Sequence, residues 1–179
     1  STLMRSSAAS DVYKRQGIYM DTDVEVLKPL DSLLSYEAVS GFESETRIPT
    51  GLMACREGQP LFEELLHEYD GIHFKLPDGS LDMTTNVTRI TNTCLKYGFV
   101  PNNQKQTIKG FTLLPQDYLC PKLKEGLGLM LTENTLTIHH FAGSWIGGTH
   151  KMKRNVAHLL GGRLTRLIIK VKRFLMCKL

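Results

Sequence analysis

The sequence predicts an α/β domain with a mixed sheet and flanking helices, and three observations support this class. Short runs over residues 18–20, 38–43 and 136–141 have the apolar, β-branched or aromatic content of strands and end at polar or small residues. Between them, residues 60–69 place apolar side chains at the 3.6-residue spacing of an amphipathic helix. The composition, with 41% apolar and 22% charged residues, is that of an ordinary globular protein.

The first of these strands is expected to be buried, and it stops at two carboxylates, Asp21 and Asp23, which are one residue apart. Open α/β sheets bind ligands at the carboxyl ends of their strands, which is where these side chains would emerge. Alternate residues of an extended segment point the same way, so both carboxylates are expected on one side. Two such anions repel unless a cation lies between them, and oxygen ligands suit Mg²⁺ or Mn²⁺. The pair is a candidate metal site, and a plain strand end followed by a turn is the alternative.

The next segments are short. Pro29 ends the strand region, and a short helix is expected after it, with Asp31 or Ser32 able to cap its first turn.

The run over residues 48–55 is apolar around Gly51. A glycine there permits either a turn or the close approach of backbone to a ligand.

Two longer helices are expected in the middle of the chain. The first covers residues 60–69 and has a proline in its first turn. Residues 70–82 contain two glycines and a proline and are typical of a loop. The second helix is expected to begin near Thr84 or Thr85 and to end at Gly98 as its C-cap.

A second candidate site follows a β-like stretch over residues 99–121. The predicted strand at 136–141 contains two adjacent histidines, His139 and His140. Neighbours on a strand project to opposite faces, so at most one of them can point into a given cleft. Imidazole binds Mn²⁺ and can complete a site begun by carboxylates. A buried, hydrogen-bonded histidine beside an exposed one is the alternative.

The net charge of +4 is unevenly distributed. Residues 17–145 carry ten basic and seventeen acidic side chains, whereas residues 146–179 carry nine Lys or Arg and no Asp or Glu. The basic pI therefore belongs to the tail, and the protein is not expected to bind nucleic acid. The spacing over residues 151–179 predicts a basic amphipathic helix, which could lie on an anionic membrane surface or pack on the domain.

The cysteines are far apart and form no Cys-x-x-Cys pair, which argues against a zinc knuckle or redox motif and favours reduced thiols. They are Cys55, Cys94, Cys120 and Cys177. No run of eighteen apolar residues is present, and the amino terminus lacks a signal pattern. A cytoplasmic location is expected, at the inner face of the cell membrane if the tail binds there.

The first sixteen residues do not resemble the start of a domain. Residues 11–16 resemble the in-frame translation of a transposon end used in preparing sequencing libraries, joined to coding sequence at Gly17. We expect residues 1–16 to be a non-native leader, with a genuine polar leader as the alternative.

The string Gly-Ile-Tyr-Met-Asp-Thr-Asp-Val-Glu-Val-Leu-Lys-Pro-Leu-Asp at residues 17–31 resembles the signature of glycosyltransferase family 32. That family has a sugar-binding region with a DXD motif and includes yeast-type mannosyltransferases and large toxin glucosyltransferases. In that family, the signature reads close to Gly-Gly-Ile-Tyr-Leu-Asp-Thr-Asp-Val-Glu. Residues 113–121 resemble the family's Ile-Tyr-Pro-x-x-Tyr-Phe-Cys-Pro, with Leu-Leu-Pro as a mild departure, and His-His-Phe-Ala-Gly-Ser-Trp at residues 139–145 resembles its C-terminal motif.

The resemblance implies a GT-A fold, the Rossmann-like fold of nucleotide-diphospho-sugar transferases. Residues 17–150 would form only part of it, because family members carry a nucleotide-binding half before the Asp-x-Asp. The implied activity is metal-dependent, retaining transfer of a sugar from a nucleotide diphosphate donor such as a UDP-sugar. The acceptor would be a hydroxyl of a glycan or lipid-linked molecule in bacterial capsule, lipopolysaccharide or glycolipid synthesis.

The resemblance also implies roles for individual residues. Asp23 would bind Mn²⁺ or Mg²⁺ directly, and Asp21 would bind the ion or contact the ribose or donor sugar; both are the candidate catalytic residues. The spacing to the following Gly favours His140 as a further metal ligand, with His139 as second choice. Ser144 and Trp145 match positions near the diphosphate, to which a hydroxyl and an indole N–H can donate, with Trp145 as a core residue as the alternative.

Two other hypotheses remain open. In a phosphatase of the haloacid-dehalogenase type, Asp21 would be the nucleophile and Asp23 an acid/base. Those enzymes have Thr or Val where this chain has Glu25, and no later Gly-Asp acidic motif is found. The second hypothesis is an inactive fragment, because a chain without the nucleotide-binding half of the family would bind no donor.

Overall fold

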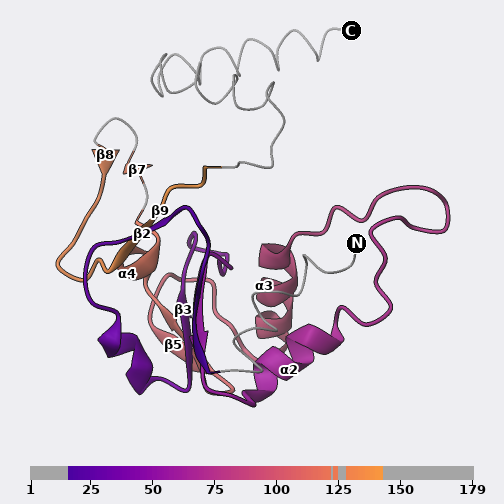
Figure 1. Cartoon of the computed structure of the whole chain (residues 1–179), viewed down its shortest axis with the longest axis horizontal. Coiled ribbons are helices and arrows are strands. Elements are labelled where there is room, and N and C mark those ends of the chain that lie inside the picture. The colour runs from indigo at the N-terminus through magenta and orange to yellow at the C-terminus, as the bar shows by residue number, and fades with distance from the viewer. Residues whose placement is uncertain (1–15, 122, 125–127, 143–179) are drawn as a thin grey trace, which may run out of the picture. The chain divides into compact units, whose positions relative to one another are not determined.

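The computed structural model describes residues 16–121, 123–124 and 128–142, which are coloured in Figure 1. They fall into two units. The first contains the described residues up to 121 together with Leu131–His140, and it carries the candidate site. The described part of the second contains the short antiparallel ladder of β7 (Leu123–Lys124) and β8 (Gly128–Leu129).

The first unit is built on a five-stranded mixed sheet of order β1-β4-β3-β6-β5. Its strands are β1 (Gly17–Met20), β3 (Ala38–Gly41), β4 (Leu52–Cys55), β5 (Gln106–Ile108) and β6 (Phe111–Leu114). Only the β3–β6 pair is parallel, and the other three pairs are antiparallel. It follows that β1, β3 and β6 run in one direction, so their carboxyl ends meet at one edge of the sheet. The predicted α/β class with a mixed sheet is confirmed.

Both faces of the sheet are covered. Side chains alternate along β4, so that Met53 and Cys55 join one core cluster while Leu52 and Ala54 join another. The first cluster is completed by α2 (Pro60–His67) and α3 (Asn86–Lys96), which lie together on one side of the sheet in Figure 1. The second is completed by η2 (Asp31–Ser35), α4 (Gln116–Leu119) and β2 (Val24–Val26).

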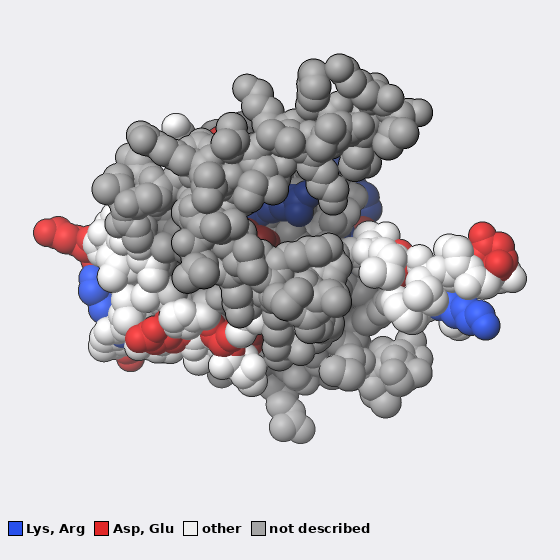
Figure 2. Space-filling model, turned by 90° about the horizontal axis from the view of Figure 1, so that it is seen from above, with Lys and Arg blue, Asp and Glu red and all other residues white. Residues whose placement is uncertain are grey.

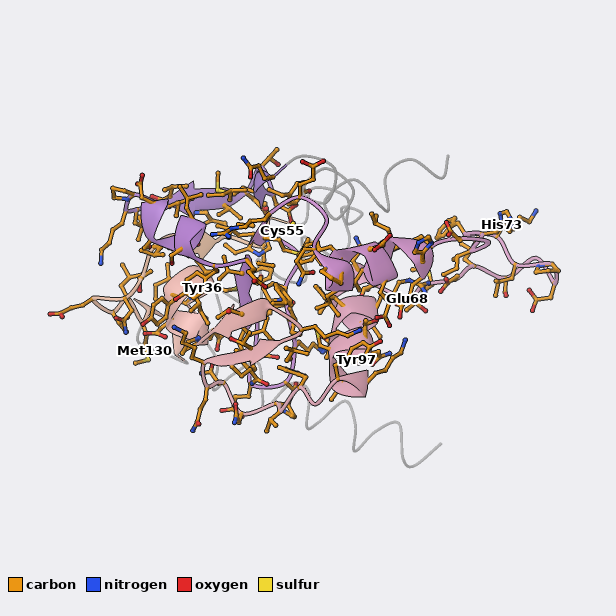
Figure 3. All side chains as sticks on the ribbon, turned by 90° about the horizontal axis from the view of Figure 1, so that it is seen from below. Tyr36, Cys55, Glu68, His73, Tyr97 and Met130 are labelled. Atoms are coloured by element: carbon orange, nitrogen blue, oxygen red, sulfur yellow. The ribbon has the colours of Figure 1, made fainter. Side chains whose placement is uncertain are left out.

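The two longer helices agree with their sequence signals. The Gln59 side chain caps α2 by accepting the backbone N–H groups of Leu61 and Phe62, and Thr85 caps α3 by accepting that of Thr88. Gly98 follows α3 with φ +88°, the conformation expected of a C-terminal glycine. The predicted loop between the helices is also present, and Figure 3 shows its residue His73 on a segment that projects away from the helices.

Three local predictions are wrong. The first strand, expected to be buried, is a half-exposed strand that pairs only with β4 among the described strands. The stretch after Pro115, expected to be β-like, forms the helix α4, because a proline can begin a helix and Gln116–Leu119 is too short to show a helical period. Neither Asp31 nor Ser32 caps the short helix, which starts after Leu30 without a side-chain cap and is of the 3₁₀ type.

Several predictions fall outside the described residues, namely those for the leader up to residue 15, for Ser144 and Trp145, and for the helix at 151–179. Cys55, Cys94 and Cys120 are buried, and their reduced state stays a prediction. Within the described ranges, no helix combines the length and apolar character needed to cross a membrane. On the face drawn in Figure 2, the described Asp and Glu side chains stand at separate places, some of them next to Lys or Arg side chains.

Candidate metal centre

The two carboxylates of the first motif lie in a turn at the carboxyl end of β1. The Asp21 N–H donates to the Gly51 carbonyl at 2.8 Å, which extends the β1–β4 pairing by one bond. The Val24 N–H then donates to the Asp21 carbonyl at 3.1 Å and closes a four-residue turn into β2. The carboxylates of Asp21 and Asp23 therefore lie near one another because of this turn, and not because of the strand alternation that we expected.

The carboxylate of Asp21 is held by a residue of the preceding strand, β1. The Tyr19 hydroxyl donates to Asp21 Oδ1 at 2.7 Å, and the Tyr19 side chain packs against the core cluster on the α2–α3 side. A hydrogen bond from a packed side chain restricts the rotation of a ligand carboxylate and so orients it toward an ion. No role was predicted for Tyr19; its position two residues before Asp21 was the available signal in the sequence.

His139 reaches the carboxylates because the last described strand of this unit pairs with β2. Strand β9 (Thr137–His139) runs antiparallel to β2 with Val24 opposite His139. This pairing places His139 Nε2 3.3 Å from Asp23 Oδ1. The side chains are sheltered, with exposed fractions of 13% for His139 and 24% for Asp23.

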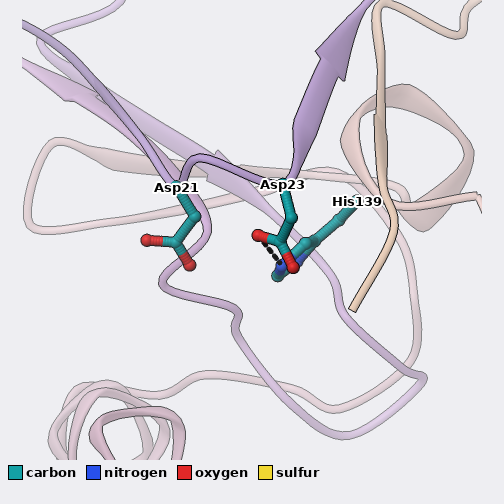
Figure 4. A group of neighbouring side chains, drawn as sticks. All are labelled: Asp21, Asp23 and His139. Carbon is teal, nitrogen blue, oxygen red and sulfur yellow. Dashed lines mark ion pairs between the residues drawn. The ribbon is translucent and has the colours of Figure 1, made fainter. Parts of the chain in front are cut away.

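Asp21, Asp23 and His139 form one cluster (Figure 4). A single ligand atom from each residue can be chosen so that all three lie within 4.8 Å of one another. Figure 4 shows the two carboxylates pointing to the same side, with the imidazole beside Asp23. The site thus joins residues that are more than a hundred positions apart in the sequence.

The structure separates the two histidines, as expected for neighbours on a strand. His140 Nε2 lies 2.8 Å from Glu25 Oε2, and about half of each of these side chains is exposed. The backbone N–H of His140 donates to the Asp23 carbonyl at 3.0 Å. The histidine favoured by spacing thus pairs with Glu25, and the second choice, His139, lies in the carboxylate cluster.

The donor set suits a divalent cation. Two carboxylates and an imidazole that bind one ion at about 2.1 Å have ligand atoms within about 4.2 Å of each other. The three chosen ligand atoms lie within 4.8 Å of one another, which is close to this limit, so small side-chain rotations would bring the three groups onto one ion. Oxygen ligands favour Mg²⁺ and Mn²⁺, and the imidazole is compatible with Mn²⁺.

Comparisons of the chain with protein-family models, with curated proteins and with solved structures found no match. The interpretation of the site therefore depends on its own residues and geometry.

Proposed function

We propose that this chain carries the metal centre of a glycosyltransferase, which moves a sugar from a nucleotide diphosphate donor to an acceptor hydroxyl. One observation carries the proposal. Two carboxylates from the turn after β1 and an imidazole from β9 gather at the carboxyl end of a sheet strand, where α/β enzymes bind their ligands. The sequence of the same turn resembles the signature of glycosyltransferase family 32, and a GT-A arrangement is part of the proposal.

Each residue has a defined task in this proposal. Asp23 and His139 hold the cation, and Asp21, oriented by Tyr19, either binds it or accepts a hydrogen bond from the ribose or donor sugar. A bound divalent ion would neutralise the negative charge that develops on the diphosphate as the anomeric carbon–oxygen bond breaks. The partial burial of Asp23 and His139 reduces competition from water for both groups.

The proposal extends to the partners of the reaction. The donor would be a nucleotide sugar such as a UDP-sugar, and the acceptor a glycan or a lipid-linked hydroxyl. The basic tail at residues 151–179 would hold the enzyme at the cytoplasmic face of a membrane that contains such an acceptor.

Thermal unfolding of the full chain with Mn²⁺, and with Mn²⁺ plus UDP, tests this function. We expect Mn²⁺ to raise the melting temperature and UDP to raise it further, because a ligand that binds only the folded state stabilises it. Asp23→Asn should lose both effects. Glu57→Gln should keep both effects. It is a matched change of a carboxylate to an amide, and Glu57 follows the end of β4 that lies opposite Gly51.

The same measurement separates the proposal from its alternatives. Stabilisation by Mn²⁺ without any effect of UDP would favour an inactive fragment that retains the ion site. An Asp23→Asn variant that responds to Mn²⁺ like the unaltered chain would end the assignment of this site.

A further inference from the structure

Gly51 lies where the two parts of the metal centre meet. It is buried and directly precedes β4. Its carbonyl accepts the Asp21 N–H, so it contacts the carboxylate segment through its backbone. On its other side is the imidazole: a Cβ added to Gly51 would lie 2.7 Å from both Cε1 and Nδ1 of His139.

The backbone conformation does not explain why this residue is a glycine. The described glycines with positive φ are Gly58, Gly71, Gly79, Gly98 and Gly110. Gly51 is not among them, so an L-residue could adopt its backbone angles. What excludes a side chain is the space, because the His139 ring already occupies the volume that a Cβ would need.

A methyl group at this position would force the ring to move. Ordinary contacts of a Cβ begin at 3.4 Å, so the ring atoms would have to retreat by about 0.7 Å from 2.7 Å. His139 is anchored by its pairing with β2 and is only 13% exposed, which leaves its side chain few other positions. The retreat would alter the 3.3 Å approach of His139 Nε2 to Asp23 Oδ1.

We propose that Gly51 is a positioning residue of the metal centre: its missing side chain provides the space in which the His139 imidazole lies beside Asp23. The effect on metal binding rests on the proposed function. The contact between Gly51 and His139 does not, and it can be measured without any ion.

A double-mutant cycle on the full chain tests the inference, with Gly51→Ala, His139→Ala and the double variant. In EDTA, Gly51→Ala should shift the NMR resonance of His139 Cε1–H. That resonance is assigned as the one missing from the spectrum of His139→Ala. Urea unfolding in EDTA should show that Gly51→Ala lowers stability in the unaltered chain and has no such effect once His139 is alanine. In a Mn²⁺ titration, Gly51→Ala should weaken affinity at least ~10-fold, as expected when a ligand-orienting residue is changed. The double variant should bind no more weakly than His139→Ala alone.

The possible results are distinct. An unmoved His139 resonance, or an equal loss of stability in both backgrounds, would overturn the inference. If Gly51→Ala does not fold, the double variant decides: folding like His139→Ala supports the inference, and failure to fold overturns it. If the unaltered chain does not bind Mn²⁺, the proposed function fails, while the resonance and unfolding data still decide whether Gly51 makes room for His139.

Discussion

The Tyr19 hydroxyl donates to Oδ1 of Asp21 at 2.7 Å, and this bond links the hydrophobic core to the candidate metal centre. The Tyr19 ring packs on the α2–α3 side of the sheet, whereas Asp21 begins the turn that leaves the sheet. The bond therefore restricts the rotation of the Asp21 side chain, which lies in a turn, by tying it to a ring that is packed in the core. A carboxylate held in this way loses less rotational freedom when it binds a ligand.

Tyr19→Phe should weaken Mn²⁺ binding by about 10-fold or more, because a hydrogen bond that orients a ligand is removed while the packed ring remains. The accompanying loss of unfolding free energy should be about 1 kcal/mol. Isothermal titration calorimetry and urea unfolding measure the two effects. Tyr97→Phe is the matched control, because the Tyr97 hydroxyl also donates to a carboxylate, Glu64 Oε2, at 2.7 Å. Equal Mn²⁺ affinity of Tyr19→Phe and Tyr97→Phe would contradict the orienting role of Tyr19.

Replacing the two histidines should have different effects on Mn²⁺ affinity. His139→Ala should lower Mn²⁺ affinity strongly, because its imidazole belongs to the carboxylate cluster. His140→Ala should change affinity little, because its imidazole pairs with the exposed Glu25. Mn²⁺ titrations followed by electron paramagnetic resonance would compare the variants. A larger loss in His140→Ala would show that the spacing argument, and not the strand pairing, identifies the ligand.

The choice between these histidines shows what the sequence could and could not predict. The alternation of strand side chains correctly indicated that His139 and His140 separate. Which of them faces Asp23 depends on the register of β9 against β2, and that register is a tertiary contact without a local signal. The strand β2 itself was not predicted, because only Val24–Val26 mark it and the carboxylates appeared to end the apolar run.

The helices and the glycine illustrate the same limit. Both α2 and α3 are long enough for the 3.6-residue spacing of their apolar side chains to be recognised in the sequence, and both helices were predicted. The four-residue helix α4 is shorter than the length over which a period can be recognised. Gly51 was predicted to make a turn or to let the backbone approach a ligand, whereas the group that the structure places against it is the His139 ring, from a strand far along the sequence.

Gln59 gives a test of the fold that does not involve the candidate metal centre. It is 5% exposed, its Oε1 accepts the N–H groups of Leu61 and Phe62, and its Nε2 donates to the Lys109 carbonyl at 2.7 Å. Gln59→Ala would remove the acceptor of the Leu61 N–H and the donor to the Lys109 carbonyl, while the Phe62 N–H would keep the Gln59 backbone carbonyl at 3.1 Å. We expect a loss of about 1 to 3 kcal/mol in unfolding free energy. Gln104→Ala, the same change at an exposed position, should stay within about 0.5 kcal/mol of the unaltered chain. Urea unfolding would measure both, and similar losses would contradict the capping role of Gln59.

The buried thiols predict a pH dependence. Desolvation by burial raises the pKa of Cys55 from 9.0 to about 11. The folded state therefore keeps the Cys55 proton at pH values where an unfolded chain releases it. The contribution of this thiol to stability is complete below pH 9 and is lost as the pH rises from 9 to about 11. Cys94 behaves in the same way, because burial raises its pKa to about 12.

Alkylation by iodoacetamide, with each cysteine followed by peptide mass spectrometry, measures this effect. A thiol with a pKa of about 11 is ionised in roughly one molecule in a thousand at pH 8, and burial blocks access as well, so Cys55 and Cys94 should react very slowly in the folded chain. The same chain in urea is the control, in which both should react at the rate of an ordinary thiol. Rapid alkylation of Cys55 at pH 8 without denaturant would mean that β4 is accessible to solvent, contrary to its place in the core between β1 and β3.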